Sequence, residues 1–162
     1  MKIRFLLCLV MALGLASAAS AQKLSGTIQC GKADLMHSVD AGDRAKHSMA
    51  LAKFHCTWTK PFEVGGTQAK ESDIVEFADT TGTVTSARGV EWGTMANGDK
   101  YFVRYQGTAT AKDGAPPTIS GNWSFTGGTG KLNGLTGKGT YRGKDNPDGG
   151  ATFEILGDHK LP

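Results

Sequence analysis

The sequence has little of what marks a membrane-spanning or nucleic-acid-binding protein. Its one long apolar run, residues 5–16, has about a dozen residues and is too short to cross a bilayer as a helix. Lysine and arginine number 18 against 15 acidic residues, so the chain lacks the basic excess that nucleic-acid binding requires. No helix stands out, and no linker or internal repeat divides the chain. These absences favour a single, mainly β domain.

The signatures of common metal and catalytic sites are also missing. There is no Cys-x-x-Cys pair and no Gly-x-Ser-x-Gly elbow. The glycine run 127–131 fails as a phosphate loop, because Lys131 is followed by leucine rather than Ser or Thr. Zinc needs three or four converging ligands, and local spacing supplies none from the four histidines, His37, His47, His55 and His159. We therefore expect no metal and no cofactor.

The first residues predict a secretory signal peptide, residues 1–21. Lys2 and Arg4 give a charged start, the apolar run follows, and Ala19-Ser20-Ala21 is a small-residue cleavage site. We expect cleavage to leave residues 22–162 as one domain, in the periplasm or secreted, with no membrane anchor. Without Lys2 and Arg4 the basic count falls from 18 to 16 against 15 acids, so the mature chain is nearly neutral.

The predicted mature chain keeps two cysteines, Cys30 and Cys56. In an oxidising compartment a lone pair is most simply one disulfide. Closing this loop would stabilise the fold by about 3.5 kcal/mol in the chain-entropy model. A metal or redox pair is the weaker alternative.

Short segments with period-two alternation and turn residues between them predict about eight strands. The expected strands cover residues 23–30, 48–59, 72–77, 83–95, 118–125, 134–142 and 151–156, with one more after Asn97-Gly98 and a short candidate at 35–39. Residues 48–54 could instead form a helical turn, since Ala, Leu, Met and Lys favour helix. Short strands at regular spacing indicate a sandwich or a closed barrel.

Asn97-Gly98 between two alternating runs is the strongest hairpin signal in the chain. A two-residue loop there places Glu91 opposite Arg104, and Gly93 opposite Phe102, which would cover its bare backbone. One face would then carry Val90, Trp92, Thr94, Tyr101, Val103 and Tyr105. The other would carry Glu91, Gly93, Met95, Lys100, Phe102 and Arg104.

Two interpretations of this hairpin remain open. In the first, the aromatic face lines the interior, and Glu91 and Arg104 form an outer cross-strand ion pair worth under about 1 kcal/mol. In the second, Glu91 and Arg104 point inward as a polar anchor for a ligand. The candidate ligand-binding residues are Trp92, Tyr101, Tyr105, Glu91 and Arg104.

The stretch 122–143 predicts a strand, a glycine-rich corner and a second strand. In the second strand Gly137 and Gly139 fall on one face and leave it bare, which lets a sheet bend or seat a large side chain. From Trp123 to Tyr141 the stretch resembles a glycine-rich motif, Gly-Gly-Thr-Gly-Lys-x-x-Gly-x-x-Gly-x-Gly-Thr-Tyr, of small bacterial exported proteins of the allene oxide cyclase–dirigent type. The resemblance implies an eight-stranded antiparallel barrel with a central cavity and lipocalin-like architecture. It does not imply cyclase activity.

Three functions are compatible with these observations. The leading hypothesis is an exported barrel that binds a small, largely apolar molecule, because eight strands leave room for one small ligand. The second is an enzyme of cyclase or isomerase type that uses the same cavity. The third is a filled barrel that binds protein partners on its outside. A cavity separates the first two from the third, and a buried acid beside it, Glu91 or Glu76, would favour the enzyme.

Overall fold

The computed structural model describes residues 20–112 and 115–162. The predicted signal peptide, apart from its last two residues, and residues 113–114 lie outside the described residues. Within the described ranges, no helix has the length and apolar character needed to span a membrane.

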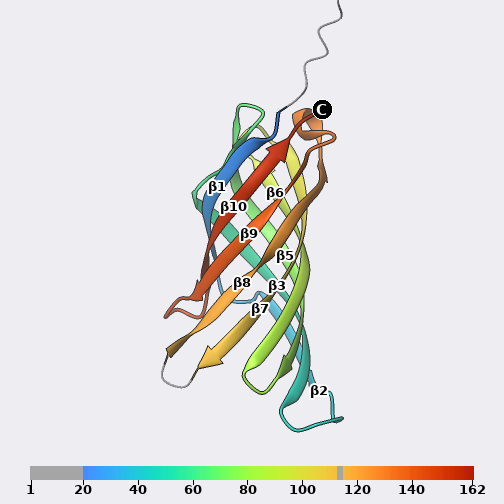
Figure 1. Ribbon diagram of the computed structural model, residues 1–162, viewed down its shortest axis with the longest axis vertical. Helices are drawn as coiled ribbons and strands as arrows, with labels where there is room; N and C mark the ends of the chain where they lie inside the picture. The colour runs from blue at the N-terminus through green and yellow to red at the C-terminus, as the bar shows by residue number, and fades with distance from the viewer. Residues whose placement is uncertain (1–19, 113–114) are drawn as a thin grey trace, which may run out of the picture.

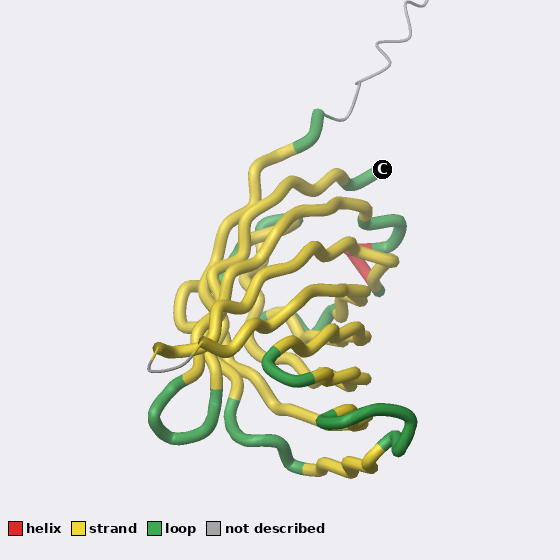
Figure 2. Tube along the Cα trace, turned by 60° about the horizontal axis from the view of Figure 1, so that its bottom comes forward, coloured by secondary structure: helices red, strands yellow, loops and turns green. Residues whose placement is uncertain are grey.

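The described chain forms ten strands and one short 3₁₀ helix, which Figures 1 and 2 show wrapped around a common axis. The strands are β1 (Gln22–Cys30), β2 (Leu35–Asp40), β3 (His47–Lys60), β4 (Glu63–Val64), β5 (Thr67–Thr81), β6 (Val84–Met95), β7 (Lys100–Lys112), β8 (Ala115–Gly128), β9 (Thr136–Asp145) and β10 (Ala151–Lys160). The helix, η1 (Gly130–Leu132), joins β8 to β9. Residues 48–54 are therefore strand rather than a helical turn.

Eight of these strands close into an antiparallel barrel, which confirms the predicted fold class. The hydrogen-bonded order runs β3-β1-β10-β9-β8-β7-β6-β5, and the pairing of β5 with β3 closes the ring. β3 is long enough to take two neighbours on one edge, since β1 pairs with its second half and β2 with its first half. Because β2 continues past the ring, it projects at the lower end in Figure 1.

A disulfide links the neighbouring barrel strands β1 and β3. Cys30 on β1 lies directly opposite Cys56 on β3, and their sulfur atoms are bonded. This confirms the predicted Cys30–Cys56 bridge. Cys56 is completely buried, so the bridge also forms part of the core.

Inward-facing glycines seat the large aromatic rings. Tyr141 lies over Gly107 and Gly121, and Phe153 lies over Gly143. A Cβ at any of these glycines would collide with the ring. These glycines therefore let aromatic side chains pack flat against the neighbouring backbone.

One end of the barrel is filled by side chains. Next to η1, the residues that are at most 1% exposed are Val64, Met95, Tyr101, Leu132 and Leu135. Phe62, from the loop after β3, packs edge-on against the Trp58 ring at a centroid distance of 4.8 Å. The interior is therefore closed at the end where the described chain terminates (Figure 1).

The β6–β7 hairpin differs from the prediction by one residue. The loop contains three residues, Ala96 to Gly98, because the Met95 N–H donates to the Asp99 carbonyl at 2.8 Å. Gly98 has φ +88°, and Asn97 has no positive φ, so this is a type I turn followed by a left-handed glycine rather than a type I′ turn. Glu91 consequently lies opposite Val103, and Val90 opposite Arg104. The predicted register is wrong, and so is the predicted cover of Gly93 by Phe102.

Candidate functional site

The barrel encloses a cavity of about 270 Å³. Its walls are mainly apolar and aromatic, and they include Leu24, Ile28, Phe54, Trp58, Ile74, Val103, Tyr105, Ile119, Trp123, Phe125, Tyr141, Phe153 and Ile155. The lining continues to Asp145, at the end of β9, and to Gly149 and Gly150 of the β9–β10 loop, at the end opposite η1. This volume lies just below the range of roughly 300–1,000 Å³ typical of small-molecule sites.

Two glutamates on neighbouring strands bring polar groups into this apolar space. Glu76 on β5 and Glu91 on β6 both line the cavity. Glu91 lies opposite Ile74, and Glu76 lies opposite Gly89, so the two acids are diagonal neighbours. Such neighbours have Cα atoms about 7–8 Å apart.

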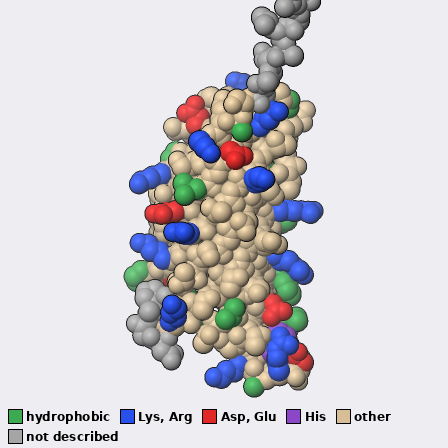
Figure 3. Space-filling model, viewed as in Figure 1, with side chains coloured by type: hydrophobic (Ala, Val, Ile, Leu, Met, Phe, Trp, Pro, Cys, Tyr) green, Lys and Arg blue, Asp and Glu red, His purple; other side chains and the backbone are tan. Residues whose placement is uncertain are grey.

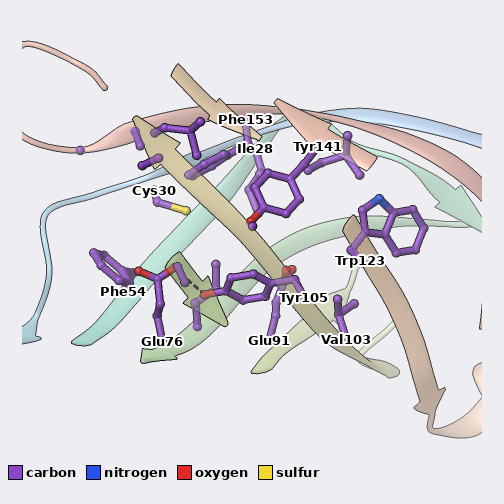
Figure 4. Close-up of a pocket in the computed structure, with 18 of the residues that line it drawn as sticks. Ile28, Cys30, Phe54, Glu76, Glu91, Val103, Tyr105, Trp123, Tyr141 and Phe153 are labelled. Carbon is purple, nitrogen blue, oxygen red and sulfur yellow. Dashed lines mark hydrogen bonds between the residues drawn. The ribbon is translucent and has the colours of Figure 1, made fainter. Parts of the chain in front are cut away.

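Each glutamate accepts a hydrogen bond from a tyrosine hydroxyl. Tyr105 donates to Glu76 Oε2 at 2.9 Å, and Tyr101 donates to Glu91 Oε1 at 3.0 Å. The Trp58 indole N–H in turn donates to the Tyr101 hydroxyl at 2.9 Å. Figure 4 shows Tyr105 lying across the wall between Glu76 and Glu91. The cavity wall thus contains two carboxyl groups, each held by a hydrogen bond from a tyrosine.

Two glycines of β6 make these contacts possible. Gly89 lies opposite Tyr105, and Gly93 lies opposite Tyr101. A Cβ at Gly89 would be 2.5 Å from the Tyr105 hydroxyl oxygen, and one at Gly93 would collide with the Tyr101 ring. Both tyrosine rings, from β7, therefore lie flat across β6.

The apolar surroundings change the acidity of these groups. Burial raises the pKa of Glu76 above its usual range, and the hydrogen bond from Tyr105 offsets part of the shift. Burial also raises the pKa of Glu91, partly offset by the bond from Tyr101. Burial, with Glu76 nearby, raises the pKa of Tyr141 to about 12. Burial in this apolar wall therefore shifts both glutamates toward their neutral form.

The structure separates the five residues singled out from the sequence. Tyr105 and Glu91 line the cavity, and Tyr101 lies behind Glu91, only 1% exposed. Trp92 and Arg104 do not line the cavity. They face outward, where the Lys53 ammonium lies 5.8 Å from the centroid of a Trp92 ring. Neither open interpretation of the hairpin holds, because the shifted register combines Glu91 with the two tyrosines.

Several lining residues were not predicted as site residues from the sequence. Phe54, Trp123 and Phe153 reach the cavity from three different strands, β3, β8 and β10. Their inward direction could be inferred from alternation, but their convergence depends on barrel closure. Glu76 was recognised only as a candidate buried acid.

The described residues contain no group of three or more His, Cys, Asp or Glu side chains that could hold a metal ion. On the face shown in Figure 3, lysine and arginine side chains are spread singly among acidic ones rather than gathered in a patch.

Comparisons with known proteins identify similar folds but no family. No protein-family model matches the chain, and no curated protein matches it. Among solved structures, it is similar to the pterocarpan synthase dirigent protein GePTS1, with 11% identity and a TM-score of 0.47 over 88% of this chain and 92% of that one. It is also similar to a pyocyanin demethylase, with 20% identity and a TM-score of 0.42 over 82% and 98%. Both of those proteins are barrels.

Proposed function

We propose that this protein is an exported β-barrel that binds one small, largely apolar molecule inside the barrel. The observation that carries the proposal is the cavity of about 270 Å³, walled by aromatic and aliphatic side chains. A barrel acting only through its outer surface would need no such space, and interiors normally pack with few voids larger than a water molecule. Binding a ligand would remove this apolar wall from water.

Export is the second part of the proposal. It rests on the signal-peptide pattern of residues 1–21 and is compatible with the buried Cys30–Cys56 disulfide. Structural disulfides persist in oxidising compartments and are rare in the cytosol. Mass measurement of the mature protein tests this directly, because cleavage should leave Gln22 as its first residue.

Native mass spectrometry tests ligand binding with a matched pair of variants. Ala87 lines the cavity, whereas its chain neighbour Ser86 is exposed and faces outward. A tryptophan at position 87 should fill the space, and one at position 86 should not. We expect wild type and S86W, purified without detergent, to carry a non-covalent mass of a few hundred daltons that A87W lacks.

The same measurement can contradict the proposal. A bare wild-type protein, still bare after incubation with a lipid and metabolite extract, would favour a barrel that acts through its outer surface. Equal ligand occupancy in A87W and S86W would place the ligand outside the barrel.

An enzyme of cyclase or isomerase type is the second candidate. It is favoured by the two cavity-lining glutamates, whose pKa values are raised by burial and which accept hydrogen bonds from tyrosines. Acids with raised pKa values suit general acid–base catalysis near neutral pH. The molecule recovered from the barrel can be incubated with wild type, E76Q and E91Q. Conversion of this molecule by wild type, without conversion by E76Q or E91Q, would establish the enzyme. An unchanged molecule in all three would support binding alone.

A further inference from the structure

The ionisable side chains of the cavity wall are all acids. Among the described residues, the ionisable side chains that line the cavity are Glu76, Glu91, Tyr105, Tyr141 and Asp145. No lysine, arginine or histidine of the described chain joins them. Every group that can ionise there becomes negative, so the wall offers nothing to balance an anionic ligand.

The tyrosine hydrogen bonds do not use all the acceptor positions of the two glutamates. Each accepts one tyrosine hydrogen bond through a single oxygen, Oε2 of Glu76 and Oε1 of Glu91. A carboxylate has two oxygens and about four acceptor positions. Because both residues line the cavity, a ligand inside it would lie beside both carboxyl groups.

Aromatic rings complete the surroundings of these acids. Tyr105 and Tyr141 meet edge to face at a centroid distance of 6.0 Å, and Tyr141 meets Phe153 in the same way at 5.9 Å. All three line the cavity, together with Phe54 and Trp123. Aromatic faces attract cations, most strongly where water is excluded.

From the all-acidic, aromatic wall we propose that the cavity selects an apolar molecule bearing a basic nitrogen, held as an ammonium or related cation against Glu91 or Glu76. The inference rests on the proposed ligand-binding function and adds the class of ligand. Ionising one of these buried carboxyl groups without a cation nearby is costly, and ionising both side by side costs more. A cationic ligand removes that cost. Either the ligand enters protonated and the carboxyl group releases its proton to solvent, or a neutral amine takes the carboxyl proton.

Three probes with one skeleton test the charge preference. Naphthalen-2-ylmethylamine, naphthalen-2-ylmethanol and 2-naphthoate share a flat apolar body and carry a cationic, a neutral and an anionic group. We expect isothermal titration calorimetry at neutral pH to show the amine binding about tenfold to hundredfold more tightly than the alcohol. The carboxylate should bind most weakly.

Variants then identify the responsible acid. E91Q and E76Q keep the shape of the side chain and remove its ability to ionise. We expect one of them, or both, to abolish the preference for amine over alcohol. E154Q is the matched control, because Glu154 is exposed on β10 and does not line the cavity, and it should keep the full preference.

The outcomes distinguish this inference from the function on which it rests. Equal affinities for amine and alcohol, or tightest binding of 2-naphthoate, would overturn the charge preference and leave a general apolar binding site. A preference that survives in both Gln variants would also overturn the assignment. No binding of any probe to wild type would count against both ligand binding and the preference.

Discussion

The hydroxyl group of Tyr105 donates a 2.9 Å hydrogen bond to Glu76 across a whole intervening strand. Tyr105 belongs to β7 and Glu76 to β5, and β6 lies between them. The contact is possible because the residue opposite Tyr105 on β6 is Gly89, over which the ring lies flat. The hydrogen bond that holds Glu76 therefore depends on glycine, which has no side chain, at position 89.

The substitution G89A should destabilise the barrel. A Cβ there would be 2.5 Å from both the Tyr105 hydroxyl oxygen and the Val75 carbonyl oxygen, and the Val75 oxygen belongs to the backbone and cannot swing away. We expect a loss of about 1–3 kcal/mol in the free energy of unfolding by urea. G31A is the control, since a Cβ at Gly31 meets nothing closer than 3.9 Å. Equal loss in both variants would contradict the packing argument.

The raised pKa of Glu91 predicts a pH-dependent gain in stability for E91Q. Burial favours the neutral acid in the folded protein, whereas the unfolded chain ionises near the ordinary value of 4.5. The stability contributed by the protonated acid is therefore complete below about pH 4.5 and is lost as pH rises through the folded pKa. We expect E91Q to be more stable than wild type at neutral pH, and the difference to shrink toward pH 4.5. Urea unfolding at several pH values measures it, and a constant difference would contradict the shift.

His47 gives a pH dependence through a different contact. It is 5% exposed, and its Nδ1 contacts Asp43 while its Nε2 lies 3.1 Å from Asp79. These contacts raise the pKa of His47, mainly through the hydrogen bond with Asp43.

The contribution of His47 to stability should accordingly be complete below its ordinary pKa of 6.5 and fade as pH rises through the folded value. We expect H47Q to lose more stability near pH 6 than near pH 9, measured by urea unfolding. H37Q, on the exposed strand β2, serves as the control and should show little loss. An equal loss for H47Q at both pH values would rule out the charged contact.

Loss of the disulfide should lower stability substantially. Cys30 and Cys56 are 26 residues apart in sequence, and opening a loop of that size costs about 3.5 kcal/mol in the chain-entropy model. We expect the double variant C30A/C56A to unfold at a clearly lower urea concentration than wild type. A reducing agent should lower the wild-type midpoint and leave that of the double variant unchanged. If complete reduction of the disulfide left the wild-type urea midpoint unchanged, the prediction would be wrong.

Much of the fold followed from local patterns. The alternating residues of 48–59 predicted a strand, and Phe54, Cys56 and Trp58 lie on the inner face of that strand, β3. The bare glycine positions of 134–142 predicted a surface able to seat large side chains, and Trp123 lies where Gly139 and Gly157 leave room. These features are local because the pleat alone fixes which side chains share a face.

The register of the β6–β7 hairpin could not be predicted from the local sequence. Asn97-Gly98 suits both a two-residue and a three-residue loop, so the dipeptide does not decide the register. The longer loop lets the Asp99 carboxylate accept from the Lys131 N–H at 3.1 Å, a contact between residues far apart in sequence. It also places Tyr101 over Gly93.

Most of the strands, the disulfide partners and an aromatic, glycine-rich interior could be predicted, because alternation, cysteine count and composition are properties of the chain. That Glu91 faces the cavity while Trp92 and Arg104 face solvent follows from the folded barrel. A change of one residue in a hairpin loop shifts every cross-strand partner by one place. Which loop forms depends on packing between distant strands, and so does the pairing of the cavity acids with Tyr101 and Tyr105.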